Sequence, residues 1–590
     1  MSNLLPLPAP YRRRRALWST LVVIFFVGYC YKGIVSTLEG RHSLEYGNDE
    51  HILIKAPLQR PSHRGDSIGA NDFRLPLHAE PQLLIAEDGE NTFSDGFMRS
   101  FERILALLPD DARVEDLIGP IQGTGERKIR EVGTRVRTYK ALLDAWEALH
   151  LVQVKEQLLV RNDILQILRH RPEITKRLGM DHARLTHAYE AYRHCLTQLS
   201  TRLFPWTAPY FADHITFHAQ FWNADRGIVF TAGDKQAPYL LTSIKSIRGL
   251  GSDLPIEVLY LGNDDLGEDY REELESIPGV ITRDISVMVH DNGWKLRGWA
   301  AKPFAILLSS FREAIFIDAD SLFVSDPAQL FLDQSYRRTG ALFFKDRLFM
   351  PQSKKAWLRR ILPSPISKQA RKSRFWTGES GHMQESGVVV VDKWRHFVAL
   401  LMVTRMNGPD RDGNKKEGRI GVYDMVYGDK ETFWLGWELV GDTEYAFHGG
   451  DAAVMGPVRV EADVGNSESL PDAGEARHAR QTDFNLQPPK QTFTICAPQL
   501  LHLGMDDRPL WFNGWLLPNK FSQTQHQQPT NFEGFIREPR IFDDSRSWRL
   551  ERNNVCCLSD YRVLNFTHAE RKMLEETIEI ARGVGAISGK

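Results

Sequence analysis

Net charge, cysteine and long apolar runs are all scarce in this sequence. Its 74 Lys and Arg residues nearly balance its 76 Asp and Glu residues, which leaves a net charge of −2 over 590 residues. That balance excludes the strong basic field of a protein that binds nucleic acid non-specifically. The five cysteines include no C-x-x-C pair, so a cysteine-based zinc site is not expected.

A single long apolar run, residues 16–31, follows a basic cluster at 12–15. Lys32 can snorkel, so the span can extend to residue 38 and reach the length of a membrane helix. Positive charge before the span keeps the N-terminus cytosolic. We expect a cytosolic tail at 1–15, one transmembrane signal anchor at 16–38 and a lumenal remainder. A cleaved signal peptide is the alternative, although no small-x-small cleavage site follows the run.

Four cysteines remain in the lumenal part, where an oxidising compartment favours one or two disulfides. A bond within the adjacent pair Cys556 and Cys557 is disfavoured by geometry, which leaves pairings with Cys195 and Cys496 open. Asn565-Phe-Thr is a glycosylation sequon, and it is usable only if this part of the chain is lumenal.

The composition changes along the first third of the chain. Residues 39–95 are polar and rich in Pro, Gly, His and Ser, which is typical of an extended stem. Residues 96–215 carry apolar side chains at helical spacing and predict a helical subdomain. Neither segment carries a recognisable chemical motif.

From residue 216 to 520 the pattern alternates between strands and helices. The predicted strands are 227–232, 256–261, 314–317 and 386–391, and the predicted helices are 238–250 and 302–311. Alternation of this kind indicates an α/β fold whose mostly parallel sheet has helices on both faces. We expect the polar segment 351–381 to be a surface insertion or a mobile lid, and residues 521–590 to form a C-terminal extension.

Two carboxylates, Asp318 and Asp320, follow the predicted strand at 314–317. Ligands of open α/β sheets bind just outside the carboxyl ends of the strands. The i, i+2 spacing puts both side chains on one side of an extended backbone, where they can bind one divalent cation. A second Asp-x-Asp pattern, Asp410-Arg-Asp412, lies in a Gly- and Pro-rich stretch, and we expect it to be a solvated loop.

Three motifs occur in order: Gly-Trp-Ala-Ala-Lys-Pro at 298–303, leading into the Asp-Ala-Asp at 318–320, then Glu-Ser-Gly at 385–387 and Gly-Asp-Lys-Glu at 428–431. They resemble the fungal Golgi α-mannosyltransferases of glycosyltransferase family 71, over about 226–515. The resemblance implies a type II Golgi membrane enzyme with a GT-A domain over 216–520. It also implies transfer from GDP-mannose to a mannose-containing glycan of a glycoprotein, in α-1,3 linkage with α-1,2 as the other candidate. The resemblance implies Mn²⁺ as the cofactor. A complex with other Golgi transferases is also compatible with the resemblance.

The resemblance also assigns roles to individual residues. The metal ligands would be Asp318, Asp320 and His502, although the motif after His502 has its Gly one place early and Arg508 in place of Lys. An imidazole with two carboxylates suits Mn²⁺ better than Mg²⁺. The residues expected to bind the donor are Thr231, Ala232, Gly233, Lys302, Asp318, Ala319, Asp320, Ser386, Gly387 and Arg508.

A retaining transfer needs a carboxylate or an amide beneath the anomeric carbon. Asp429 is the first candidate for this role, followed by Glu431 and Glu385, and each could instead bind a sugar hydroxyl. Trp434 and Trp437 are expected in the core, with stacking on acceptor sugars as the alternative.

Two other functions stay open. One keeps the fold and uses a UDP-sugar as an α-glucosyl- or α-galactosyltransferase. The other is a Golgi scaffold subunit with a degenerate site, which the intact carboxylates Asp318, Asp320, Glu385 and Asp429 argue against.

Overall fold

The computed structural model describes residues 84–85, 90–461, 491–519, 527–540, 547–552 and 555–587, with side chains from Asp95 onward in the first helix. The described residues all belong to one compact unit, 72–590. The predicted tail, anchor and most of the predicted stem lie outside the described residues. Within the described part, no helix is long and apolar enough to cross a membrane.

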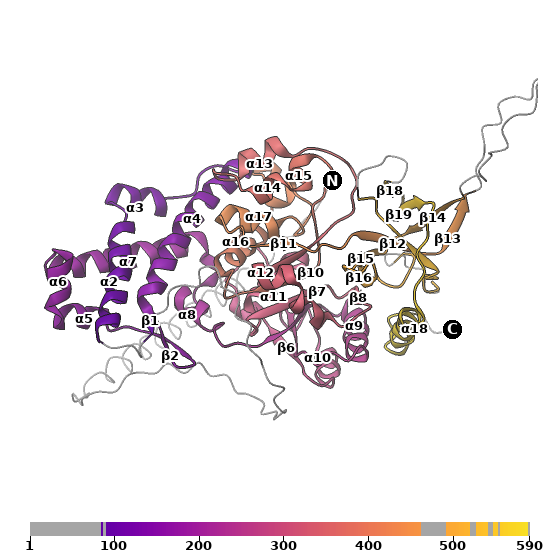
Figure 1. Cartoon of the computed structure of the whole chain (residues 1–590), viewed down its shortest axis with the longest axis horizontal. Coiled ribbons are helices and arrows are strands. Elements are labelled where there is room, and N and C mark those ends of the chain that lie inside the picture. Colours follow the sequence, from indigo (N-terminus) through magenta and orange to yellow (C-terminus); the bar gives the residue numbers. More distant parts are fainter. Residues whose placement is uncertain are drawn as a thin grey trace, which may run out of the picture. The chain divides into compact units, whose positions relative to one another are not determined.

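The predicted helical subdomain is confirmed in its helical character (Figure 1). It also contains a small sheet of three strands that the helical periodicity did not predict. Its elements are α2 (Glu90–Leu107), α3 (Asp111–Ile118), α4 (Gly125–His150), α5 (Ile164–His170), α6 (Pro172–Leu178), α7 (His182–Leu203), α8 (His214–Ala219), β1 (Leu84–Ile85), β2 (Leu151–Val154) and β3 (Gln157–Val160).

A seven-stranded mixed sheet follows, in the order β11-β9-β10-β7-β4-β5-β6. All neighbours are parallel except that β10 runs antiparallel to both β7 and β9. The mostly parallel sheet is thus confirmed, with one reversed strand. The strands are β4 (Arg226–Thr231), β5 (Ile256–Tyr260), β6 (Val280–Asp284), β7 (Glu313–Ile317), β9 (Ala341–Lys345), β10 (Gln384–Asp392) and β11 (Ala446–Phe447).

Helices cover both faces of this sheet, as expected. Alternate strand residues point to opposite sides, so Val229 and Phe316 pack in one apolar core while Ile228 and Ile315 pack in another. The first core joins the sheet to the helical subdomain without a break. Its helices include α11 (Ala301–Leu308), α16 (Phe397–Asn407) and α17 (Thr432–Val440), whereas α9 (Ala237–Gly249) and α12 (Gln334–Thr339) pack in the second core.

The segment 351–381 is not a structureless insertion. It folds into three short helices, α13 (Lys355–Ile361), α14 (Lys368–Arg371) and α15 (Arg374–Thr377). Leu358, Ile361 and Phe375 are completely buried in the first core. Most residues of the segment are exposed or half-buried, as expected for a surface segment, but the expectation that it is irregular was wrong. Short polar helices can bury a few apolar side chains at positions that composition alone does not reveal. A further helix, α10 (Glu268–Glu275), precedes β6.

Two smaller antiparallel sheets complete the fold (Figure 1). They combine strands from the predicted catalytic domain with strands after residue 520, so each sheet has strands on both sides of the predicted boundary. The five-stranded sheet consists of β17 (Gly534–Arg537), β12 (Ala452–Gly456), β15 (Leu500–Leu503), β16 (Pro509–Asn513) and β8 (Ser321–Phe323). The four-stranded sheet consists of β13 (Val458–Glu461), β14 (Thr492–Ala497), β19 (Cys556–Asp560) and β18 (Arg549–Leu550). The last described helix is α18 (His568–Gly583).

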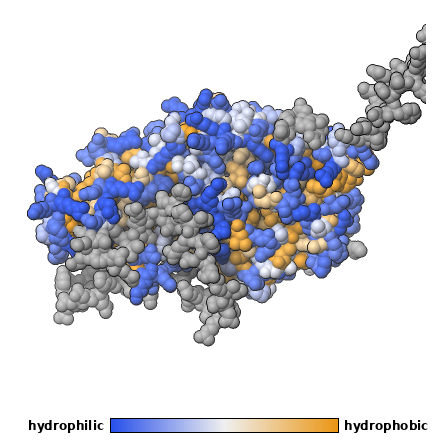
Figure 2. Space-filling model, in the orientation of Figure 1, coloured by the Kyte–Doolittle hydropathy of each residue, from blue (hydrophilic) through white to orange (hydrophobic). Residues whose placement is uncertain are grey.

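A disulfide joins Cys496 of β14 to Cys557 of β19. The two residues are directly opposite each other in the antiparallel pair. Cys195 and Cys556 are buried free thiols. One disulfide is therefore present among the four cysteines considered above. The face of the molecule in Figure 2 is mainly hydrophilic, with hydrophobic side chains in separate patches.

Candidate active site

The carboxylates Asp318 and Asp320 lie where two sheets meet. The short segment 318–320 connects the end of β7 in the large sheet to β8 in the five-stranded sheet. The Asp318 backbone N–H donates to the Gly387 carbonyl at 2.8 Å, which fixes the start of this turn against β10. The apolar residues of β7 are buried, so the aspartates emerge at the carboxyl end of a buried strand, as the sequence predicted.

Lys302 lies between two of the predicted carboxylates. From α11, its Nζ approaches Asp318 Oδ2 at 2.8 Å and Asp429 Oδ2 at 3.3 Å, and it donates to Ser386 Oγ at 3.3 Å. Ser386 Oγ in turn donates to Asp429 Oδ2 at 2.8 Å. Four residues from three separate motifs are therefore brought together as one hydrogen-bonded group.

The electrostatics of this group reflect its burial. Burial raises the pKa of Asp318 to about 7, with Asp320 and Asp429 adding to the effect and Lys302 opposing it. Burial by itself would lower the pKa of Lys302, but Asp318 and Asp429 raise it well above its usual value. The lysine is thus held as an ammonium, and it compensates acidic charge that would otherwise be costly to bury.

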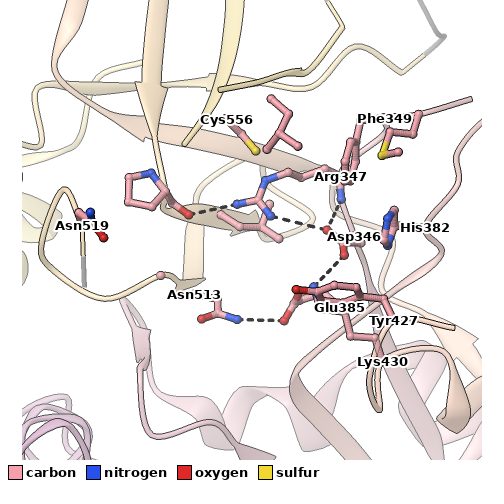
Figure 3. A pocket seen from close by; sticks show the side chains of 15 residues that line it. Asp346, Arg347, Phe349, His382, Glu385, Tyr427, Lys430, Asn513, Asn519 and Cys556 are labelled. Carbon is pink, nitrogen blue, oxygen red and sulfur yellow. Dashed lines mark hydrogen bonds and ion pairs between the residues drawn. The ribbon is translucent and has the colours of Figure 1, made fainter. Parts of the chain in front are cut away.

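A second lysine-centred group, drawn in Figure 3, includes the sequence neighbours of the first, since Glu385 precedes Ser386 and Lys430 follows Asp429. Lys430 Nζ lies 2.6 Å from Glu385 Oε2 and 2.9 Å from Asp346 Oδ2. Asn513 Nδ2 donates to Glu385 Oε1 at 3.0 Å. Sequence reasoning identified Glu385 but missed Asp346, Lys430 and Asn513. The one available signal was the position of Lys430 directly after Asp429 within the Gly-Asp-Lys-Glu motif.

Both acids of this second group are held in the charged form. Burial would raise the pKa of Asp346, but Lys430 and Arg347 lower it far below its usual value. Burial would likewise raise the pKa of Glu385, and Lys430 makes the net shift downward. The two lysine-centred groups therefore present fixed carboxylate oxygens together with ammonium groups.

The second group forms part of the wall of a cavity of about 460 Å³. Volumes of this size are typical of sites for small ligands. The aromatic rings of Phe349, His382 and Tyr427 line another part of the wall, and Cys556 and Leu550 lie on the side of the four-stranded sheet. A smaller cavity of about 270 Å³ shares His382 and Tyr427 with the first.

Glu431, the second catalytic candidate, lines the smaller cavity and is almost fully buried. Its two oxygens accept hydrogen bonds from the Met383 backbone N–H at 2.8 Å and from Trp434 Nε1 at 2.6 Å. Burial raises its pKa to about 7, although both donors favour the carboxylate. These contacts anchor the start of α17 to β10 and give Glu431 a structural task.

His502 lies on β15, packed between aromatic rings. It stacks on Trp511 with ring centroids 4.1 Å apart and meets the edge of Phe344 at 5.3 Å. Burial lowers its pKa to about 3, so the imidazole is neutral, and its Nε2 is buried with no hydrogen-bond partner. A neutral imidazole with an unpartnered nitrogen has the chemistry of a metal ligand.

The donor types of Asp318, Asp320 and His502 fit a divalent cation such as Mn²⁺. Their geometry is looser than that of a closed metal site. Among the described residues, the one set of three candidate ligand atoms within 4.8 Å of one another is Cys496, Glu551 and Cys557, and its two cysteines form the disulfide. The predicted ligand set is therefore present in chemistry but not drawn together.

Of the residues expected to bind the donor, Thr231 is the last residue of β4, and Ala232 and Gly233 follow it. A Cβ atom on Gly233 would lie 2.6 Å from Asp265 Oδ1, so close packing requires glycine there. Gly387 is equally confined, because a Cβ would lie 2.9 Å from Ser321 Oγ and 3.2 Å from Asn513 Nδ2. Ala319 is buried between the two aspartates.

Arg508 makes different contacts from those expected. Its guanidinium binds the Glu570 carboxylate through two nitrogens, Nε at 3.0 Å, and donates to the Asn565 carbonyl at 3.2 Å. Arg508 thereby ties β16 to the start of α18, and its phosphate role stays a prediction. The side chain of Asn565 is exposed, as a glycosylation site requires.

Two expectations about aromatic and acidic residues have clear outcomes. Trp434 and Trp437 are completely buried in α17, so the expectation that they lie in the core is confirmed. Asp410 is not in a solvated loop. It is buried and pairs with Arg405 at 2.6 Å and Lys128 at 2.6 Å. That expectation was wrong because Asp410 is buried by contacts that include Lys128 of the distant helix α4, which the local composition does not reveal.

The sequence around this site is similar to that of known mannosyltransferases. A family model described as "Mannosyltransferase putative" matches residues 225–504, which include the lysines and carboxylates of both groups. Over that segment, just under half of the chain, the sequence is similar to mannosyltransferases. Among its relatives, "Putative alpha-1,3-mannosyltransferase MNN1" of Candida albicans is 27% identical over 416 residues, covering 62% of this chain and 47% of that protein. "Alpha-1,3-mannosyltransferase MNT3" of Saccharomyces cerevisiae is 26% identical over 365 residues, covering 55% and 52%.

The chain spans about half the length of the curated relatives it matches. Among solved structures, "Core-mannan synthase A (CmsA/Ktr4) from Aspergillus fumigatus, Mn/GDP-form" is 11% identical. It covers 38% of this chain and 73% of that chain, with a TM-score of 0.25. A likeness at that level is too low to support a conclusion about this site.

Proposed function

We propose that the protein is a metal-dependent retaining mannosyltransferase with a GT-A type donor site, which moves mannose from GDP-mannose to a mannose-containing glycan. The observation that carries this proposal is the group formed by Lys302, Asp318, Ser386 and Asp429 at the carboxyl end of β7. It lies within the segment matched by the mannosyltransferase family model. The names of the relatives support α-1,3 linkage, and α-1,2 is the other candidate.

Asp318 and Asp320, with His502 as a further candidate, would hold the Mn²⁺ ion. A bound divalent ion supplies positive charge to the departing diphosphate. Lys302 provides a second positive charge beside Asp318, and it can turn toward phosphate oxygens when the metal neutralises that carboxylate. The unpartnered Nε2 of His502 is the feature that supports its role.

The transfer breaks the bond from the mannose C1 atom to the diphosphate oxygen and forms a bond from C1 to an acceptor hydroxyl oxygen. The acceptor proton passes to the departing phosphate oxygen, so no strong general base is required. Attack and departure on the same face retain the α configuration. Asp429 is suited to stabilise positive charge on C1, because Ser386 and Lys302 fix its carboxylate in one orientation.

We also propose that the protein acts in the Golgi lumen as a type II membrane protein anchored through residues 16–38. The disulfide between Cys496 and Cys557 supports an oxidising compartment. The exposed side chain of Asn565 in its sequon is consistent with lumenal glycosylation. The acceptor would then be a glycan on a glycoprotein, and other Golgi transferases are candidate partners.

The experiment uses the detergent-solubilised full chain with Mn²⁺, GDP-mannose and α-mannobiose, followed by linkage determination of the product. We expect a trisaccharide with retained α configuration, and loss of the reaction in EDTA. Asp318→Asn should lower the rate by at least about a hundredfold, since it removes a charge at the metal site. Asp412→Asn is the matched control, because Asp412 is exposed and pairs with its neighbour Arg411.

The proposal fails if GDP-mannose is not consumed while a UDP-sugar is, or if Asp318→Asn transfers mannose at the rate of the control. Activity with UDP-glucose or UDP-galactose would establish the UDP-sugar alternative. If the protein turns over none of these donors, the alternative of a scaffold subunit with a degenerate site is favoured.

A further inference from the structure

Two large aromatic side chains are exposed beside the main cavity. Trp299 is 59% exposed and Tyr427 is 63% exposed. Trp299 is the one tryptophan with an exposed side chain among those the structure describes. A large exposed ring is informative because apolar surface is normally buried when nothing binds it.

These rings belong to a continuous row of four. Trp299 and Tyr427 have centroids 6.3 Å apart, Tyr427 and His382 are 6.2 Å apart, and His382 stacks on Phe349 at 4.8 Å with an interplanar angle of 3°. Tyr427, His382 and Phe349 line the 460 Å³ cavity, and Tyr427 and His382 also line the smaller one. The aromatic row thus runs from exposed surface into the candidate active site.

The backbone holds the outer part of the row in place. Trp299 lies in a short 3₁₀ turn, η3 (Gly298–Ala300), immediately before α11 and Lys302. Gly428, directly after Tyr427, has a φ of +60°, and a Cβ there would lie 3.3 Å from Trp299 Cε3. Glycine therefore allows the indole to lie against this turn. The row is anchored to the same two segments that carry Lys302 and Asp429.

The inner end of the row is polar but balanced in charge. Tyr427, His382 and Phe349 share the cavity wall with Asp346, Glu385, Lys430 and Arg347. Two carboxylates and two cations give no net charge there, which does not favour a strongly charged ligand. Fixed carboxylate and amide groups bind hydroxyls, and ring faces bind C–H surfaces. A neutral hexose offers both kinds of surface.

We infer that the aromatic row of Trp299, Tyr427, His382 and Phe349 binds the acceptor as an extended neutral oligosaccharide. Its reacting end would lie in the cavity, and its remaining sugars would lie along the exposed rings. This inference rests on the proposed function for the identity of the sugar. It adds that the acceptor is recognised over several units rather than by its terminal sugar alone.

The test measures binding without donor or turnover. The solubilised full chain is titrated by calorimetry with α-mannobiose and with an α-linked mannotetraose. We expect the tetrasaccharide to bind more tightly than the disaccharide. Trp299→Ala and Tyr427→Ala should each weaken tetrasaccharide binding by about threefold to tenfold, which is the range expected for losing one ring contact. Trp299→Phe keeps an aromatic ring and should retain most of the affinity.

Tyr210→Ala serves as the matched control, because Tyr210 is 52% exposed and lines neither cavity. It should bind both sugars as the wild type does. Equal affinity for the two sugars, or tetrasaccharide binding unchanged in both alanine variants, would overturn the inference. Such results would leave the proposed function intact if mannose transfer to mannobiose is observed. Conversely, length-dependent binding without transfer from GDP-mannose would support the role of the aromatic row and refute the proposed reaction.

Discussion

At the residue scale, lysines rather than carboxylates explain how this site tolerates so much buried acid. Lys302 lies between Asp318 and Asp429, and Lys430 lies between Asp346 and Glu385. Removing one member of a buried charged group leaves its partners uncompensated, which is costly. The carboxylates are therefore positioned before any ligand arrives, a condition that favours electrostatic catalysis.

Glu431 gives the folded state a pH dependence that can be measured. Burial raises its pKa to about 7 from an ordinary value of 4.5. The folded state therefore keeps its proton through a range in which the unfolded chain has lost it. The contribution to stability is fully present below about pH 4.5 and is lost as the pH rises to about 7, by about 3 kcal/mol in total.

The measurement compares the thermal midpoints of wild type and Glu431→Gln between pH 4.5 and 7.5. The wild-type midpoint should fall relative to that of the variant up to about pH 7, and above that pH the difference between the two midpoints should stay constant. Glu444→Gln, which changes an exposed glutamate near the end of α17, should follow the wild-type pH profile. A Glu431→Gln profile parallel to the wild type would contradict the prediction.

The sequence predicted those site residues that lie within a recognisable local pattern. Asp318 and Asp320 could be predicted because they follow a short apolar run, and Asp429 could be predicted from its motif. Asp346 could not be predicted, because it becomes part of the site through Lys430, 84 positions further along the chain. Trp299 was missed for another reason: no local pattern states which tryptophans are exposed.

At the element scale, β10 shows both the strength and the limit of sequence patterns. Its run of apolar residues predicted a buried strand, and all nine residues from Gln384 to Asp392 are buried. An apolar run carries no information on direction, so the antiparallel pairing with β7 and β9 was not predicted. The reversal matters, because it brings Glu385 and Ser386 to the edge where β7 ends.

Gly387 on β10 offers a test of this packing. In Gly387→Ala, the added Cβ would lie 2.9 Å from Ser321 Oγ, 3.1 Å from Trp511 Cζ3 and 3.2 Å from Asn513 Nδ2. Accommodating it must shift Asn513, which donates to Glu385. We expect a loss of about 1 to 3 kcal/mol in unfolding free energy, as for other overpacked cores, together with lower transfer activity.

Thermal unfolding and initial rates measure both effects. Gly249→Ala is the control, because Gly249 ends α9 with no atom within 4 Å of a Cβ added there. It should leave stability and rate nearly unchanged or raise stability slightly. Equal behaviour of the two variants would show that the contacts around Gly387 are not tight.

At the scale of the whole molecule, the part predicted to be catalytic and the part after residue 520 share their sheets. β17 pairs with β12, and β19 pairs with β14. α18 packs against α9 through the hydrogen bond from Ser246 Oγ to Thr577 Oγ1 at 3.0 Å. The sequence suggested a boundary after residue 520 because the α/β alternation ends there. It could not reveal pairings between strands separated by long stretches of chain.

The disulfide between Cys496 and Cys557 should stabilise this shared structure. It closes a loop of 61 residues in sequence separation. Removing it in Cys496→Ser should cost about 4 kcal/mol if chain entropy accounts for its effect. The measurement is the thermal midpoint with and without reductant, with thiol counting to confirm reduction.

Cys195→Ala changes a buried cysteine outside the disulfide and should keep the wild-type response to reductant. In Cys496→Ser, reductant should no longer change the thermal midpoint. If full reduction leaves the wild-type midpoint unchanged, the bond does not stabilise the fold.

The shared sheets also impose an order on the folding of this chain during its synthesis. Leu550 and Cys556, near the end of the chain, form part of the wall of the same cavity as Asp346 and Glu385. A chain is synthesised from its N-terminus at about 5–20 residues per second, and early segments usually fold first. Here the helical region and the large sheet can form early, but the cavity lacks a wall until the last strands emerge. During its synthesis the chain therefore passes through a stage in which Asp346 and Glu385 are already present but the wall of the cavity is incomplete.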